Sequence, residues 1–238
     1  MAAEYRLRGI ETTTPPWPLL IEIARETPHE SWILIGGMMV HLHALRGRIT
    51  ATRPTTDVDL LLTLEAITRS ISEVAGPLQS LGMRPLDSHG PFHRFTRGDD
   101  IVDIMVSKQA GRANWAQRPI MRASGATLAL QYPDIYLIEV DGRDVRLTMP
   151  NTPAAIVLKA AAYRDDPRDR DRHLEDLAVL FAAAPPGIGT TADIPRSQRR
   201  HLRLALQHLA DPGHPAWQTL DSYERDLAWA NFTSFTHE

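Results

Sequence analysis

The chain has 238 residues and a formal net charge of −3, from 26 basic and 29 acidic side chains, so no protein-wide field draws it onto nucleic acid. The composition is globular, cysteine is absent, and no apolar run approaches the roughly 18–20 residues that cross a bilayer. These features exclude disulfides, thiolate zinc sites and cysteine nucleophiles. No signal peptide is visible in residues 1–10, so we expect a cytoplasmic protein.

The first part of the sequence predicts alternating strands and helices. Short apolar runs bounded by turn residues predict buried strands, and helical spacing of apolar residues predicts helices. We expect residues 1–10 to be poorly ordered, and residues 107–123 show no clear period. The expected elements are a helix at 19–25, a strand at 32–35, a helix at 38–45, a strand at 57–62, a helical stretch at 64–81 disturbed at Gly76-Pro77, and hairpins at 93–106 and 135–149.

After Pro150 the pattern becomes helical. Helices are expected at 152–164, 168–183, 196–210 and 216–231, with proline–glycine turns between them. The predicted fold class is α/β (α+β). Residues 1–150 would form a mixed sheet with flanking helices, and residues 151–238 a C-terminal helical domain. This pattern occurs in many folds and does not by itself give a function.

Gly36 and Gly37 stand where a buried strand gives way to a helix. Glycines at such a point let backbone N–H groups approach a ligand, and the N-terminus of a helix favours an anion such as phosphate. An ordinary tight turn explains the pair equally well. The pair therefore indicates a phosphate site only in combination with other residues.

Asp57 and Asp59 lie two apart in a predicted strand, so their side chains share one face. Two carboxylates about 6–7 Å apart repel each other unless a cation lies between them, and divalent metals prefer oxygen ligands. Asp103 is the only polar residue of the run 101–106 and would add a third carboxylate if the strands are neighbours. Two-metal phosphoryl transfer needs this geometry. The alternatives are solvated edge aspartates, and an arginine partner for Asp103.

Lys159 is one of only two lysines, with Lys108, among 26 basic residues. It is also the only charged residue from Pro153 to Tyr163, so it must snorkel, pair or face a polar cleft. A cleft that holds a triphosphate would satisfy it.

The stretch 164–173 alternates in charge, which usually indicates a salt-bridged exposed face. From this region only Arg164 and Asp176 are candidate site residues. His41 and His43 lie on different faces of one helix, so packing or support of the site is expected for both.

In their order and spacing, these motifs resemble the nucleotidyltransferase superfamily typified by DNA polymerase β. The closer likeness is to its AbiEii/MenT-like branch, the toxins of type IV toxin–antitoxin pairs. It covers about residues 30–180 and is carried by Gly36-Gly37, Arg53-x-Thr-Thr56-Asp57-x-Asp59, Asp103, Lys159 and Asp176. The resemblance implies Mg²⁺ or Mn²⁺ bound by Asp57, Asp59 and Asp103. It implies an NTP bound by Gly36, Gly37, Arg53, Thr56 and Arg164, and a site completed by Lys159 and Asp176.

The resemblance also implies an activity: transfer of a nucleoside monophosphate from an NTP to an acceptor hydroxyl, with release of pyrophosphate. The implied acceptor is the 3′ end of tRNA, and the implied partner is a separately encoded antitoxin. A basic patch that would suit an RNA backbone, or form a solvated helix face, comprises Arg196, Arg199, Arg200 and Arg203. The alternatives are transfer to an antibiotic or a protein hydroxyl, or a catalytically silent binding module. His173, which stands where relatives often carry an acid, gives the silent module some weight, whereas the intact Asp57, Asp59 and Lys159 argue against it.

Overall fold

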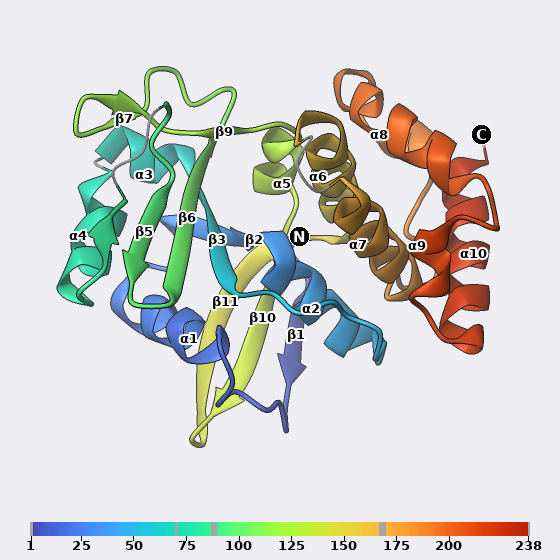
Figure 1. The fold of residues 1–238 in the computed structure, drawn as a ribbon, viewed down its shortest axis with the longest axis horizontal. Coiled ribbons are helices and arrows are strands. Elements are labelled where there is room, and N and C mark those ends of the chain that lie inside the picture. Colours follow the sequence, from blue (N-terminus) through green and yellow to red (C-terminus); the bar gives the residue numbers. More distant parts are fainter. Residues whose placement is uncertain (1, 70, 87–89, 167–169, 238) are drawn as a thin grey trace.

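The structure, a computed structural model, describes residues 2–69, 71–86, 90–166 and 170–237. Over these ranges the fold is mixed α/β, with the strands in the first 150 residues and helices after them, which confirms the predicted fold class (Figure 1). Among the helices described, none combines the length and the apolar character needed to cross a membrane.

The larger sheet has the strand order β2-β3-β6-β5-β4, with β9 also paired to β6. Strands β3 and β6 are parallel, whereas β2 and β5 run antiparallel to their neighbours. All four residues of β2 are buried, as the continuous apolar run predicts. The strands are β2 (Trp32–Ile35), β3 (Asp57–Leu62), β4 (Arg84–Pro85), β5 (Arg94–Arg97), β6 (Asp100–Ser107) and β9 (Arg122–Ala123).

A second sheet comprises β1 (Glu4–Leu7), β10 (Pro133–Val140) and β11 (Arg143–Pro150), in the order β1-β10-β11. The predicted hairpin around Asp141-Gly142 is confirmed. The prediction of a poorly ordered N-terminus is wrong for β1, which pairs in parallel with β10. The partner strand lies about 130 residues along the chain (131 from Ala3 to Asp134), so no local sequence pattern could reveal the pairing.

Helices α1 (Trp17–Glu26), α2 (Gly36–Gly47), α3 (Leu64–Arg69) and α4 (Ser72–Ser80) belong to the sheet-containing part. The helical stretch at 64–81 was predicted to be interrupted at Gly76-Pro77. The interruption instead lies earlier, between α3 and α4, and Pro77 lies inside α4. A proline removes one helical hydrogen bond, and this short helix tolerates the loss. Residues 107–123, which show no period, contain the strands β7 (Asn114–Trp115) and β8 (Arg118–Pro119), which pair with each other. Helix α5 (Ala126–Gln131) follows them.

The C-terminal part consists of α6 (Thr152–Asp165), α7 (Asp171–Ala182), a 3₁₀ turn (Thr191–Asp193), α8 (Arg196–Leu209), α9 (Pro215–Gln218) and α10 (Ser222–Thr236). The single helix predicted at 216–231 is wrong, since the chain breaks between α9 and α10. Asp221 and Glu224 form a capping box that starts α10, and this D-x-x-E signature was readable in the sequence. Part of the start predicted for the helix at 168–183 lies outside the described residues.

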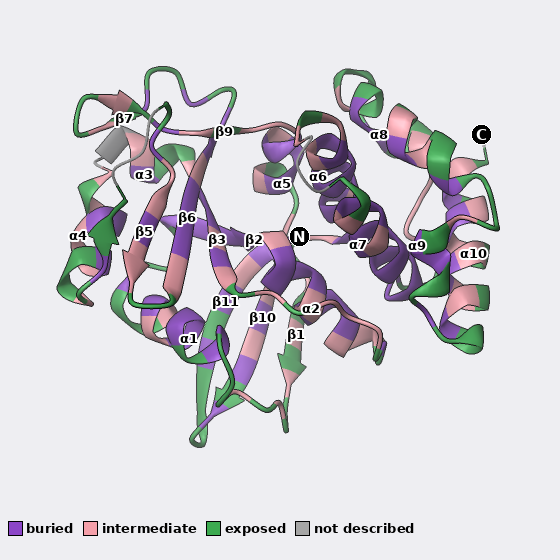
Figure 2. Ribbon diagram, in the orientation of Figure 1, coloured by how far each residue is buried: buried purple, intermediate pink, exposed green. Residues whose placement is uncertain are grey.

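One hydrophobic core joins the two parts of the chain. Helix α2 packs against strand β3 and also against α6 and α7. A Cβ on Gly47 of α2 would approach the backbone of Ala183, so the two parts meet closely there. Helices α2, α6 and α7 are mostly buried in Figure 2. The residues at the start of α2 are thereby held rigidly between the larger sheet and the C-terminal helices.

Candidate active site

Three carboxylates meet at the centre of the larger sheet. Asp57 and Asp59 are the first and third residues of β3, and Asp103 is the fourth residue of the neighbouring strand β6. The parallel register pairs Asp59 directly with Asp103. One oxygen atom from each of the three side chains lies within 4.8 Å of the other two. The expectation that the two strands are neighbours and bring the carboxylates together is therefore confirmed.

The glycine pair lies directly against these carboxylates. Gly36 has φ +73°, and a Cβ at this position would overlap the Asp59 carboxylate, so both its backbone conformation and its surroundings require glycine. A Cβ on Gly37 would overlap the hydroxyl of Thr55. Helix α2 begins at Gly36, two residues earlier than predicted, which places both glycines in its first turn. The N–H groups of that turn have no helical partners and can bind an anion.

Thr55 is a site residue that the sequence analysis missed. Its hydroxyl donates a 3.0 Å hydrogen bond to Oδ1 of Asp57, and the same side chain packs against Gly37. The bond joins two side chains only two residues apart, but the contact of Thr55 with Gly37 depends on packing that the sequence does not reveal. Thr56, predicted to bind the nucleotide, is exposed in the same loop.

Arg94 is a second residue that the sequence analysis did not find. Its Nε and Nη2 atoms donate to the two oxygens of Asp103, each at 2.7 Å, and these bonds raise the pKa of the guanidinium. The arginine partner considered as an alternative for Asp103 is thus present, together with the carboxylate cluster. The turn at Gly98-Asp99 fixes the β5–β6 register and places Arg94 opposite Asp103. The hairpin was predicted with Gly98, Asp99 and Asp100 in its turn, which would pair Arg94 with Ile104, so the observed register differs from the predicted one by one residue.

A second charged cluster joins Lys159 of α6, Asp176 of α7 and Arg53 of the loop before β3. Nζ of Lys159 donates to Oδ2 of Asp176 at 2.6 Å, and Nε of Arg53 donates to Oδ1 at 3.0 Å. Burial alone would raise the pKa of Asp176, but the charges and hydrogen bonds of Lys159 and Arg53 outweigh burial and lower it. Asp176 is therefore an ionised partner of two cations.

The two clusters face each other closely enough to interact. Burial and the charges of Asp57 and Asp103 raise the pKa of Asp59 to about 7, while the charges of Lys159 and Arg172 act in the opposite direction. Arg172 of α7 donates to Asp166 at 2.9 Å, which is a salt bridge within the alternating stretch 164–173 but not one of the pairs expected there, Asp169 with Arg172 or His173 and Arg172 with Asp176. Asp169 of that stretch lies outside the described residues.

A cavity of about 210 Å³ adjoins the second cluster and is lined by Ala51, Thr52, Arg53, Glu175, Asp176, Val179 and Thr219.

Arg164 is the predicted site residue that the structure does not bring to the carboxylates. It lies near the end of α6, where it forms an ion pair with Asp165 and lowers the pKa of His201.

His43 is buried, with Nε2 3.0 Å from the carbonyl oxygen of Pro150, and burial lowers its pKa to about 3. It links α2 to β11, which agrees with the expected packing role.

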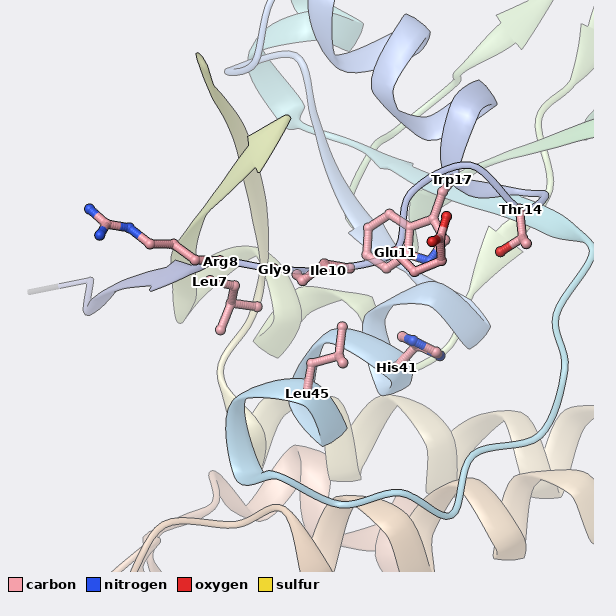
Figure 3. A pocket seen from close by; sticks show the side chains of 9 residues that line it. All are labelled: Leu7, Arg8, Gly9, Ile10, Glu11, Thr14, Trp17, His41 and Leu45. Atoms are coloured by element: carbon pink, nitrogen blue, oxygen red, sulfur yellow. The ribbon is translucent and has the colours of Figure 1, made fainter. Parts of the chain in front are cut away.

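A separate cavity of about 330 Å³ lies between the N-terminal segment and α2 (Figure 3). Its lining includes Trp17 and His41, whose rings meet edge to face, together with Leu7 and Leu45. None of the predicted site residues lines it. The cavity is therefore distinct from the two charged clusters.

The carboxylate cluster has the donor chemistry of a divalent metal site. Its three residues offer only hard oxygen ligands, which Mg²⁺ and Mn²⁺ prefer. The raised pKa of Asp59 reflects the mutual repulsion and burial that a bound cation would relieve. Because Arg94 binds both oxygens of Asp103, Asp57 and Asp59 would be the main ligands, with Asp103 contributing its remaining lone pairs.

No protein-family model and no curated protein sequence matches the chain. Three solved structures are similar over most of their length. An antigenic nucleotidyltransferase-like protein from Paracoccidioides brasiliensis is 14% identical with a TM-score of 0.47, and the match covers 87% of this chain and 86% of that one. Two structures of ANT(2″)-Ia are each 17% identical with a TM-score of 0.36, over 91% of this chain and 92% or 87% of theirs. One is a complex with adenylyl-2″-tobramycin, and the other is described as an antibiotic-resistance factor. At these identities and scores, what this chain binds has to be inferred from its own residues.

Proposed function

We propose that the chain is a metal-dependent nucleotidyltransferase, which transfers a nucleoside monophosphate from an NTP to an acceptor hydroxyl and releases pyrophosphate. The observation that carries the proposal is the meeting of Asp57, Asp59 and Asp103 within 4.8 Å, directly beside the glycine turn that starts α2. Metal ligands and a phosphate-binding helix start are thereby adjacent. Catalysis of phosphoryl transfer consists largely of positioning and charge stabilisation, which these groups supply.

The triphosphate would lie between the glycine turn and the second charged cluster. The N–H groups of Gly36 and Gly37 at the start of α2 would bind phosphate oxygens. Lys159 and Arg53 would supply a point charge and a planar fork, and Asp176 holds both cations in place. The phosphates would then share these cations with Asp176.

A divalent cation on Asp57 and Asp59 would neutralise the triphosphate and polarise its α-phosphate. The acceptor oxygen forms a bond to the α-phosphorus while the bond to the oxygen bridging the α- and β-phosphates breaks. Pyrophosphate leaves with the electron pair of that bond. The acceptor proton passes to Asp103 or Asp176. Each of these carboxylates has both oxygens hydrogen-bonded to cations, and Asp103 is the one that lies among the other carboxylates.

The acceptor that we propose is the 3′ end of tRNA, modified in the cytoplasm by a toxin that a cognate antitoxin neutralises. Support comes from the motifs that the chain shares with AbiEii/MenT-like proteins: the glycine pair, Arg53, the two aspartates of β3, Lys159 and Asp176. Expression of the chain should arrest bacterial growth. The Asp57→Asn variant should not, and co-expression of the neighbouring gene should restore growth if that gene encodes the antitoxin.

The decisive test is transfer of label from each of the four NTPs to total tRNA in the presence of Mg²⁺ or Mn²⁺. The protein should label RNA, and Asp57→Asn should abolish labelling. Asp99→Asn is the matched control, because Asp99 is an exposed acid in the β5–β6 turn. Absence of label on every RNA contradicts the RNA acceptor. Label on an aminoglycoside, a lincosamide or a protein, with RNA inert, would establish that acceptor, and absence of Mg²⁺-dependent NTP binding in calorimetry would establish a silent module.

A further inference from the structure

Two segments of the chain carry basic residues and no acidic ones. The first runs from 104 to 133, between Asp103 and Asp134, and the second from 194 to 210, between Asp193 and Asp211. Their basic residues are Lys108, Arg112, Arg118 and Arg122 in the first segment, and Arg196, Arg199, Arg200 and Arg203 in the second. The two segments therefore hold eight of the 26 basic side chains and none of the 29 acidic ones, a separation that the net charge of −3 conceals.

The fold places these two segments on the same side of the molecule. The first contains β7, β8, β9 and α5, and the second contains α8; helices α5 and α8 both pack against α6 (Figure 1). Burial and the charge of Arg164 lower the pKa of His201 in α8 to about 4, and Arg200 and Lys108 act in the same direction. A residue of the first segment thus lies within electrostatic reach of the second. We call the eight basic residues together the basic surface.

Backbone carbonyls hold two arginines of the basic surface. Arg122 donates to the carbonyl of Lys108 at 3.1 Å, and Arg199 donates to that of Ile194 at 2.7 Å. Such bonds fix a guanidinium without neutralising it. Exposed members of the surface are Lys108, Arg112, Arg122, Arg196, Arg199, Arg200 and Arg203. One acid, Asp165, lies beside the surface and is bound by Arg164 and Ser124.

Strand β6 and helix α6 lead from the two charged clusters toward the basic surface. Strand β6 carries Asp103 and ends at Ser107, about 13 Å further along the strand. Helix α6 carries Lys159 and reaches Arg164 about 7.5 Å further along its axis. A polymer lying on the basic surface could therefore extend one end to the carboxylates. Both parts of the chain would contact it.

We propose that the basic surface binds the sugar–phosphate backbone of a nucleic acid whose end reaches the carboxylates as the acceptor. An extended array of guanidinium groups suits phosphodiesters, because each planar fork can bind two phosphate oxygens. The role as acceptor site rests on the proposed function. Binding of the backbone requires neither NTP nor catalysis.

The test is fluorescence anisotropy of labelled tRNA and of single-stranded DNA, without NTP, between about 50 and 200 mM salt. The variant Arg196→Gln/Arg200→Gln/Arg203→Gln changes only exposed cations of α8. We expect it to weaken binding about tenfold or more and to lower the slope of log affinity against log salt by about 2–3. Lys108→Gln/Arg112→Gln should weaken binding in the same way. The control Arg84→Gln/Arg143→Gln/Arg146→Gln removes three exposed cations from β4 and β11 and should bind like the unmodified chain.

Equal affinity of the α8 variant and the control would overturn the proposal, and so would binding that does not weaken with salt. Equally tight binding of an acidic polypeptide would also overturn it, by indicating a protein partner. The outcomes separate this proposal from the proposed function. Salt-sensitive RNA binding by the unmodified chain and by Asp57→Asn, with no label transfer, would keep the basic surface and reject the transferase. Normal RNA labelling by a variant that lacks the α8 cations would keep the transferase and reject the basic surface.

Discussion

Nζ of Lys159 lies 2.6 Å from Oδ2 of Asp176, and the two side chains are only 5% and 3% exposed. The lysine that stands alone in an apolar helix therefore pairs with an acid of the next helix, 17 residues along the chain. Arg53 binds the other oxygen of the same carboxylate. One acid thus holds two cations beside the carboxylates of β3 and β6. A triphosphate would share these cations with Asp176.

We predict that Lys159→Arg folds normally and loses most transfer activity. The guanidinium keeps the ion pair with Asp176, but a planar fork does not replace a compact ammonium as a point charge on phosphate. We expect kcat/KM to fall by about ten- to a hundredfold. Lys159→Met should instead destabilise the fold by about 3 kcal/mol, because it leaves a buried carboxylate with one partner fewer. Urea unfolding and steady-state transfer kinetics measure the two effects, and full activity of Lys159→Arg would contradict the proposed role.

Most of the individual elements and the pair of Asp57 and Asp59 were predictable because their signals are local. A strand places Asp57 and Asp59 on one face, and the lone Asp103 in an apolar strand marks a neighbour of that face. The glycine pair was recognisable at the start of a helix. The hairpin of β5 and β6 was also predictable, but the pairing of Arg94 with Asp103 depends on a turn one residue shorter than the predicted one.

Contacts between distant segments were not predictable in the same way. The strand β1 pairs with β10, whose sequence lies about 130 residues away, and nothing in residues 4–7 indicates that partner. The binding of Lys159 and Arg53 to a single acid depends on how α6, α7 and the loop before β3 pack. Arg164 and Arg172 belong to one alternating charge pattern, and only the packing distinguishes which of them reaches Asp59.

Gly36→Ala should abolish metal-dependent NTP binding. The new methyl group would overlap the Asp59 carboxylate, and alanine at φ +73° adds about 1 kcal/mol or more of backbone strain. Gly76→Ala is the matched control, since Gly76 lies in α4 with open space around the added Cβ. That control should be neutral or slightly stabilising. Calorimetric titration with NTP and Mg²⁺ checks both variants, and normal binding by Gly36→Ala would exclude the close approach of the glycine turn to Asp59.

Asp59 should make the metal-free protein less stable at high pH. Its pKa is raised to about 7 by burial and by Asp57 and Asp103, so the folded chain holds this proton more tightly than the unfolded chain. The resulting stability is complete below about pH 4 and is lost as pH rises through about 7. Asp59→Asn removes this dependence. In EDTA, we expect the free energy of unfolding of the unmodified protein to fall by about 2 kcal/mol relative to that of the variant between pH 5 and 8.

The Asp59→Asn variant has to be compared with the unmodified protein because buried histidines change the stability with pH in the opposite direction to Asp59. Burial lowers the pKa of His43 to about 3, and burial with the charge of Lys159 lowers that of His173 to about 4. These groups withdraw stability as pH falls below about 6.5, in both proteins alike. Urea unfolding at several pH values isolates the contribution of Asp59. A pH-independent difference between the two proteins would show that this carboxyl titrates normally.

Arg94 should determine how strongly the protein depends on a divalent cation. Arg94→Met removes both hydrogen bonds to Asp103 and leaves three carboxylates within 4.8 Å without that counter-charge. Without metal the variant should unfold at a lower temperature, and added Mg²⁺ should restore more stability to it than to the unmodified protein. Transfer should still fall, because Asp103 loses the two bonds that orient it. Arg97→Met is the control: Arg97 lies on the same strand and binds Glu22 and Asp100 instead. Thermal unfolding with and without Mg²⁺ measures the difference, and an equal gain from Mg²⁺ in both variants would place the cation away from Asp103.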